Sequence, residues 1–119
     1  MEKTVNKVEL NGFIGIDPEM KTFDNGGKIM RFTLATHENY KNREGEWVKE
    51  TTWHHVVLWN KTAERAEELL KKGIRVSLTG KLVNRFYTDN KGNKKYVSEI
   101  IAYNFELPVV QNSIKTMKQ

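Results

Sequence analysis

Apolar and polar residues alternate along most of this chain of 119 residues, and only one segment has the spacing of an α-helix. A period of two is typical of β-strands that bury one face, whereas a helix repeats its apolar residues every three to four positions. Turn sequences separate the segments, notably Asp24-Asn25-Gly26-Gly27 and the Asp-Asn-Lys-Gly-Asn run at 89–93. The alternating segments are 4–16, 28–38, 47–59, 74–87 and 94–107, and the helical segment is 62–72.

The order of these segments is three strands, one helix and two more strands. It predicts an all-β protein of the OB-fold class, a five-stranded Greek-key barrel with one short helix between strands 3 and 4. The length suits one domain, which we expect to span residues 1–107, followed by a short flexible tail at 108–119. Asn60 or Thr62 is expected to cap the helix, and Gly73 to follow its last turn.

Parity within each strand predicts which side chains share a face. The segment from Tyr40 to Glu46 is polar and contains a Gly, so it is expected to be a loop. Three apolar sets share a parity within their strand, namely Val8, Leu10, Ile14 and Ile16; Met30, Phe32 and Leu34; and Ile101, Tyr103 and Phe105. Val56 and Leu58 are expected in the core. Ile74, Val76, Leu78 and Leu82 are expected to point inward. In the helix, Ala63, Ala66 and Leu69 or Leu70 form a narrow apolar stripe that could plug one end of the barrel.

The third strand contains all three tryptophans of the chain at positions of one parity, so an unbroken strand projects them from one face. Binding a single nucleic-acid strand without reading its sequence requires aromatic rings on which bases stack and cations along the backbone path. A single Trp in a small β-domain is a core or interface residue about as often as it is a binding residue, but three on one face favour stacking. The candidate stacking residues are Tyr40, Trp47, Trp53, Trp59, Phe86 and Tyr87. The candidate phosphate-binding residues are Lys7, Lys41, Arg43, Lys49, Lys61, Lys72, Lys81 and Arg85.

Composition excludes several other classes of function. The chain has no cysteine, which excludes disulfides and Cys-based zinc sites, and its net charge of +5 leans mildly toward polyanions. His54 and His55 are adjacent and point to opposite faces of a strand, and Asp17 and Glu19 flank a turn at Pro18. We therefore expect no enzyme activity, no catalytic residue, no metal and no cofactor. The absence of a signal peptide or a membrane-spanning run predicts a soluble intracellular protein.

A family resemblance covers residues 5–105. The chain resembles the bacterial single-stranded-DNA-binding proteins of the tetrameric OB-fold type. The segments that carry the resemblance are Asn6-Lys7-Val8, Gly12 with Gly15, Asp17-Pro18-Glu19, Asn25-Gly26-Gly27, Phe32 with Leu34-Ala35-Thr36, Glu38, Gly45, Thr52-Trp53-His54 with Val56-Val57, Lys61 with Ala63-Glu64, Lys72-Gly73, Gly80 with Leu82, Arg85, Tyr87-Thr88-Asp89, Gly92 and Glu99-Ile100.

The resemblance implies sequence-tolerant binding and protection of single-stranded DNA in replication, recombination and repair, in the cytoplasm at the nucleoid. It assigns the principal stacking positions to Tyr40, Trp53, Trp59 and Tyr87, and it places His54 at a subunit contact of a homotetramer, with a dimer as the lesser possibility. Family members usually end in a flexible region with an acidic tip that recruits other proteins. This sequence has no acidic residue after Leu107, so recruitment through such a tip is not expected.

Three alternatives are open from the residues alone. An OB-fold could instead be an RNA-binding or translation module, since RNA readers differ by their contacts to the 2′-hydroxyl. A nuclease would need clustered metal ligands, which the sequence does not offer. A pure interaction module would bury the same aromatic rings against protein.

Overall fold

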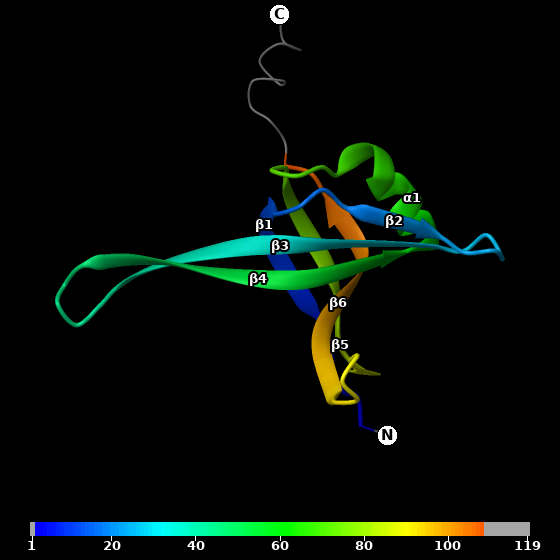
Figure 1. Ribbon diagram of the computed structural model, residues 1–119. Helices are drawn as coiled ribbons and strands as arrows, with labels where there is room; N and C mark the ends of the chain where they lie inside the picture. The colour runs from blue at the N-terminus through cyan, green and yellow to red at the C-terminus, as the bar shows by residue number, and fades with distance from the viewer. Residues whose placement is uncertain (1, 109–119) are drawn as a thin grey trace, which may run out of the picture.

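The computed structural model describes residues 2–108 and forms a small barrel from which two long hairpins project (Figure 1). The elements in chain order are β1 (Val8–Ile14), β2 (Glu19–Thr22), β3 (Lys28–Lys41), β4 (Trp47–Trp59), α1 (Asn60–Leu69), β5 (Arg75–Thr88) and β6 (Lys94–Glu106). No helix within this part of the chain is long and apolar enough to cross a membrane. The predicted tail at 108–119 lies outside the described residues, apart from Pro108.

The strands follow the order β1-β5-β6-β4-β3-β2, and a further pairing between β1 and β3 closes the ring. Closure uses two residue pairs, Phe13 with Ala35 and Ile14 with Leu34. The β4–β6 contact is the parallel one, and it is also short, with Val56 opposite Ile100. The five-stranded OB-fold barrel is thereby confirmed. β2 is an additional strand along β3 that the sequence did not reveal, because four residues are too few to show alternation.

Alternation explains how the barrel is filled. Met30, Phe32 and Leu34 of β3 and Val56 and Leu58 of β4 are buried, as their parity predicts. The helix segment contributes the plug that its apolar stripe predicts, with Ala63, Ala66 and Leu70 in the same core cluster, whereas Leu69 is exposed. The other buried members of this cluster are Ile14, Val76, Leu78, Ile100, Ala102 and Phe105.

Arg65 fastens the helix to the end of β6. Its Nη2 donates to the carbonyl oxygen of Phe105 at 2.7 Å, and its guanidinium carbon lies 4.0 Å from the centre of the Phe105 ring. The hydrogen bond and the cation–π contact fix α1 against the barrel.

Three of the parity predictions are wrong. Ile16 follows the end of β1 and is exposed, so it does not continue the inward row. Leu82 is exposed because β5 has by then left the barrel and entered the free hairpin. Tyr103 is exposed because the β5–β6 register shifts between Thr79 and Gly80. Thr79 pairs with Asn104 and Gly80 with Ala102, so Tyr103 is the extra residue on β6. Such a β-bulge reverses the parity of the residues that follow it.

The predicted ends of three elements are also wrong. β1 spans Val8–Ile14 rather than 4–16. β3 continues to Lys41, so Tyr40 lies in a strand rather than in a loop. The helix spans 60–69 instead of 62–72, because Leu70 is extended. Its N-cap position is Trp59 with no side-chain cap, and the Asn60 side chain instead accepts a hydrogen bond from the backbone N–H of Lys28 at 3.0 Å. Gly73 has a positive φ of 88°, but in the turn beyond the helix end.

The same kind of turn closes both long hairpins. Asn42 Oδ1 accepts hydrogen bonds from the backbone N–H groups of Glu44 and Glu46, and Asp89 Oδ1 accepts the equivalent bonds two and four residues farther along the chain. Gly45 and Gly92 supply the positive φ that each turn requires. These local bonds fix the hairpin registers without help from the core.

Barrel closure predicts a strong effect at Gly12. A Cβ there would overlap the backbone carbonyl oxygen of Ala35, which cannot move without opening the β1–β3 contact. We expect Gly12→Ala to lower the free energy of unfolding by at least about 1–3 kcal/mol in urea denaturation. The control is Gly27→Ala, whose new Cβ would meet side-chain atoms rather than backbone, with Asn25 at 3.1 Å and Asn60 and Phe23 at ordinary contact distance. Equal midpoints for both variants would contradict this view of closure.

Candidate nucleic-acid interface

The three tryptophans lie along β4 with their side chains exposed. Trp47, Trp53 and Trp59 are 71%, 57% and 43% exposed, while Val56 and Leu58 of opposite parity are buried. The antiparallel register with β3 is continuous from Ile29 opposite Trp59 to Lys41 opposite Trp47, so no bulge separates the tryptophans. The predicted parity of the tryptophans is therefore confirmed along an unbroken strand.

Trp53 has its position because Gly15 has no side chain. A Cβ on Gly15 would overlap the Trp53 indole, so the ring packs directly against the backbone just after the end of β1. The backbone N–H of Gly15 donates to the Thr33 carbonyl oxygen at 2.9 Å and fixes that segment. Gly15 thus supports a candidate stacking residue, a role that its place in the sequence did not reveal.

Trp59 does not stand alone, because Phe23 stacks beside it. The ring centres are 6.4 Å apart with an interplanar angle of 19°, and Lys21 Nζ lies 5.4 Å from the centre of the Phe23 ring. Phe23 was not among the candidates, since it lies beside the Asp24–Gly27 turn and belongs to no alternating segment. The contact stiffens Trp59 and leaves it about half exposed.

Tyr40 lies on the other face of the β3–β4 ribbon. The register places it opposite Val48, one residue out of phase with Trp47 and Trp53, and its side chain is 45% exposed. The ribbon therefore presents rings on both faces, and Tyr40 and the tryptophans do not form one flat platform. Parity within a single strand could not reveal this, because it depends on the pairing between two strands.

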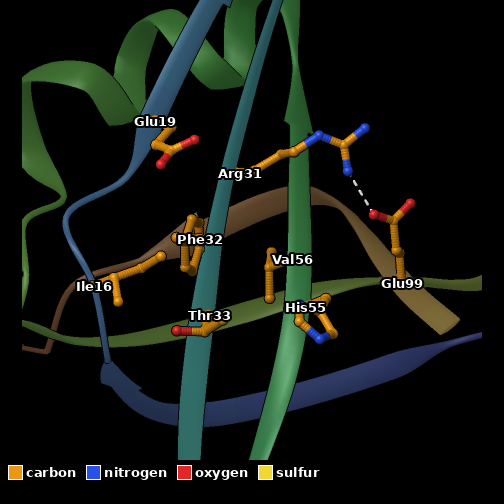
Figure 2. Close-up of a pocket in the computed structure, with 8 residues that line it drawn as sticks. All are labelled: Ile16, Glu19, Arg31, Phe32, Thr33, His55, Val56 and Glu99. Atoms are coloured by element: carbon orange, nitrogen blue, oxygen red, sulfur yellow. Dashed lines mark hydrogen bonds and ion pairs between the residues drawn. The ribbon is translucent and has the colours of Figure 1, made fainter. Parts of the chain in front are cut away.

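Tyr87 and Arg85 of β5 approach the tryptophan face of the ribbon across a groove. Arg85 lies 5.7 Å from the Tyr87 ring centre, measured from its guanidinium carbon. A hollow of about 480 Å³ is lined by these two residues together with Arg31, His55, Val97 and Glu99. A second hollow of about 200 Å³ shares Arg31, His55 and Glu99 and extends toward Ile16 and Glu19 (Figure 2). The groove thus joins Tyr87 and Arg85 of β5 to His55, on the face of β4 that carries the tryptophans.

Glu99 joins three strands beneath this groove. Its side chain is only 8% exposed, and it forms ion pairs with Arg31 of β3 and with Arg85 of β5, the latter at 3.2 Å. The Arg31 side chain crosses β4 to reach it (Figure 2). Burial alone would raise the pKa of Glu99, but hydrogen bonds and charge attraction from both arginines outweigh burial and hold that pKa below its ordinary value. The same pairing raises the pKa of Arg85.

The candidate phosphate-binding residues differ in whether a carboxylate already neutralises them. Lys7 pairs with Glu9 at 2.9 Å, a contact that raises the pKa of Lys7, and Arg85 pairs with Glu99. Lys41 lies over the Trp47 ring, 5.4 Å from its centre. Over residues 2–108, six candidates have no carboxylate within 4.0 Å, namely Lys41, Arg43, Lys49, Lys61, Lys72 and Lys81. Arg31 was not predicted, although it lines both hollows.

His54 points to the side of β4 opposite the tryptophans and hydrogen-bonds Thr36 Oγ1 at 2.9 Å. Burial lowers the pKa of His54, so the ring is neutral at physiological pH. Asp17 has a structural use, since its Oδ1 accepts a hydrogen bond from the Lys72 backbone N–H at 3.0 Å. Within the described residues, no three side chains of His, Asp or Glu are placed to hold a metal ion.

Exposed rings beside a cationic groove on a closed OB-fold barrel define the class of oligonucleotide-binding barrels. Residues 5–108 match the model of the single-strand binding protein family, and the chain belongs to that family. It is 40% identical over 108 residues to single-stranded DNA-binding protein 1 of Chlorobaculum tepidum, an alignment that covers 90% of this chain and 67% of that protein.

Two solved structures have the same fold. One is the Plasmodium falciparum SSB complex with ssDNA, with a TM-score of 0.80 and 31% identity, covering 93% of this chain and 99% of that one. The other is a deletion mutant of the single-stranded DNA binding protein from Thermus aquaticus, with a TM-score of 0.78 and 25% identity, covering 91% of this chain and 52% of that one.

The charge on Glu99 should make stability depend on pH in a defined range. Because its pKa is lowered on folding, its contribution is fully present above the ordinary value of 4.5 and is lost as the pH falls through the lower folded value. We expect Glu99→Gln to lower the free energy of unfolding by about 1–3 kcal/mol at pH 7, with the difference from the parent shrinking below pH 4.5. Urea titrations over this range measure it.

Glu50→Gln is the matched control, because Glu50 is an exposed residue of β4. It should leave both the stability at pH 7 and the pH profile unchanged. A Glu99→Gln profile parallel to that of the parent would show that the Glu99 charge does not stabilise the joint between β3 and the β5–β6 hairpin.

Proposed function

We propose that this protein binds single-stranded DNA without reading its sequence, by stacking bases on the exposed rings of β4 and β5 and by holding phosphates on nearby cations. Membership of the single-strand binding protein family and the fold shared with an SSB complex with ssDNA support this function. It is a binding function, not an enzymatic one, and it suits a protein that covers DNA during replication, recombination and repair.

The observation that carries the assignment to residues is the groove that joins Tyr87 to His55, on the face of β4 that also carries Trp53 and Trp59. Arg31, Arg85 and His55 line it, so phosphates could be held between rings that receive the bases. Trp53, Trp59 and Tyr87 are each about half exposed, so their rings are accessible to a base. Base–aromatic stacking contributes about 1–3 kcal/mol per base and tolerates every base, because each has a π-face.

The strand should first cross the tryptophan face of the ribbon and then pass Tyr87. Trp53 and Trp59 are six residues apart on β4, a span of about 20 Å at about 3.3 Å per residue, which leaves room for several nucleotides between them. Trp47 lies farther out on the same face, and Tyr40 would receive a base only if the strand curves around the ribbon to its other face. They are therefore secondary stacking positions in this proposal.

A homotetramer is the assembly that the family implies, with His54 at a subunit contact. His54 is partly buried within one subunit already, and its hydrogen bond to Thr36 orients the ring. Sedimentation of the parent and of His54→Ala tests the assignment. The cytoplasmic, nucleoid-associated location stays a prediction that follows from the proposed ligand.

Trp fluorescence tests the function directly. Adding oligo(dT) at low salt should quench the emission, and the logarithm of the affinity should fall linearly with the logarithm of the salt concentration, with a slope of about −0.7 per phosphate bound. Trp53→Ala should weaken binding by about 1–3 kcal/mol and leave the oligomer intact. The matched control is Trp47→Ala, which removes an equally large ring at the outer end of β4 and should weaken binding less.

Two results would overturn the proposal. Emission that stays unchanged in excess oligo(dT) would exclude stacking on any tryptophan. Dissociation of the oligomer in Trp53→Ala would instead assign the ring to a protein interface. Oligo(U) belongs in the same experiment, because tighter binding of RNA would favour the alternative of an RNA-binding module.

A further inference from the structure

The β5–β6 hairpin carries a second pair of rings on the face opposite Tyr87. Phe86 and Tyr96 are direct cross-strand partners, with ring centres 5.9 Å apart and an interplanar angle of 41°. They are 76% and 67% exposed. Because side chains alternate along a strand, this pair faces away from Arg85 and Tyr87 and from the groove between β4 and β5.

The hairpin leaves a route between its two faces. Beyond Gly80, β5 no longer pairs with β1, and the Asn6 side chain hydrogen-bonds both backbone groups of Leu82, so the outer edge of β5 has no strand partner from Val83 to Thr88. A hollow of about 410 Å³ at this end is lined by Phe86, Tyr87, Thr88 and Lys94, and thus includes a ring from each face. A chain that lies on Tyr87 could pass around the edge of β5 and reach Phe86.

The hairpin also concentrates the positive charge of the protein. Residues 81–101 contain five Lys and Arg against two carboxylates, a net charge of +3. The other described residues contain 13 of each sign. Both carboxylates of the hairpin are engaged, since Asp89 accepts hydrogen bonds from its own turn and Glu99 binds two arginines. The field around Phe86 and Tyr96 therefore attracts a polyanion.

We propose that Phe86 and Tyr96 form a second base-stacking surface, so that single-stranded DNA leaving Tyr87 wraps around the β5 edge and continues over the far face of the hairpin. The inference rests on the proposed function and extends it to a residue, Tyr96, that parity and family resemblance did not indicate. A second copy of this chain is the less favourable occupant, because two such hairpins would bring net charges of like sign together.

A length series of oligo(dT) tests the wrap, with binding followed by Trp emission, since neither ring is a tryptophan. In the Phe86→Ala/Tyr96→Ala double variant, the shortest oligomers that bind the parent should bind equally well. Longer oligomers should bind at least about fivefold more weakly than they bind the parent. The number of nucleotides covered per subunit at saturation with poly(dT) should fall. Tyr96→Phe keeps the ring and should behave as the parent.

Tyr103→Ala is the matched control, because Tyr103 is an exposed tyrosine of β6 outside the hairpin. It should leave the length series unchanged. Photocrosslinking of oligo(dT) that contains 5-iodouracil, followed by peptide mapping, should join the DNA to Tyr96. Sedimentation of the double variant should give the parent mass.

The inference is overturned if the double variant matches the parent at every length, or if it loses the shortest oligomers as severely as Trp53→Ala does. A changed oligomeric mass with unchanged DNA binding would overturn it as well and assign the pair to a subunit contact. Failure of the proposed function looks different, because the parent itself would then leave oligo(dT) unbound.

Discussion

The barrel depends on a contact between two backbones that leaves no space for a side chain. At the closure of β1 on β3, Gly12 lies against the carbonyl oxygen of Ala35, and at the bulge of β6, Gly80 lies against that of Ile101. A ring of five strands with such a small interior closes only if some residues contribute no volume at the seams. Gly15 also lacks a side chain, and the Trp53 indole occupies the space that a side chain there would fill. The absence of side chains at Gly12 and Gly15 thus both allows the barrel to close and positions a candidate stacking ring.

The two long hairpins extend beyond the core and need supports of their own. Side-chain turns fix their tips, and Glu99 fixes the base of the β5–β6 hairpin to β3 through Arg31. A buried carboxylate is unfavourable unless it is paired, and the two arginines provide that pairing for Glu99. Most of the other N–H donors of the two arginines form no hydrogen bond within the described residues. Each arginine side chain is about half exposed, so a buried structural charge holds two surface cations in the groove. This pairing joins β5, which carries Tyr87, to β3 of the tryptophan ribbon.

Local pattern was enough to predict most of the barrel and the exposed tryptophans. Met30, Phe32 and Leu34 alternate within one uninterrupted pairing, so parity sufficed for them. Parity failed at Leu82, because β5 loses its pairing with β1 just before that residue. It failed at Tyr103, because the bulge depends on how β6 pairs with β5. Neither event can be read from one strand alone. The faces of Tyr40 and of the Phe86–Tyr96 pair follow from cross-strand register for the same reason. Arg31 and Glu99 are 68 residues apart, and no local signal joins them.

Charge and aromatic surface are distributed unequally over the two hairpins. Residues 36–52, the outer part of the β3–β4 ribbon, carry three cations against four glutamates, so Lys41, Arg43 and Lys49 lie in a field that is not attractive to phosphate over a long range. The β5–β6 hairpin carries a net charge of +3 and the smaller rings. The ribbon can therefore supply stacking that depends little on salt, while the hairpin supplies attraction that salt screens. Neither contribution depends on base identity, because rings meet the π-face of any base and cations meet the shared backbone. Such a division gives tight binding to any sequence without a dedicated pocket for any single base.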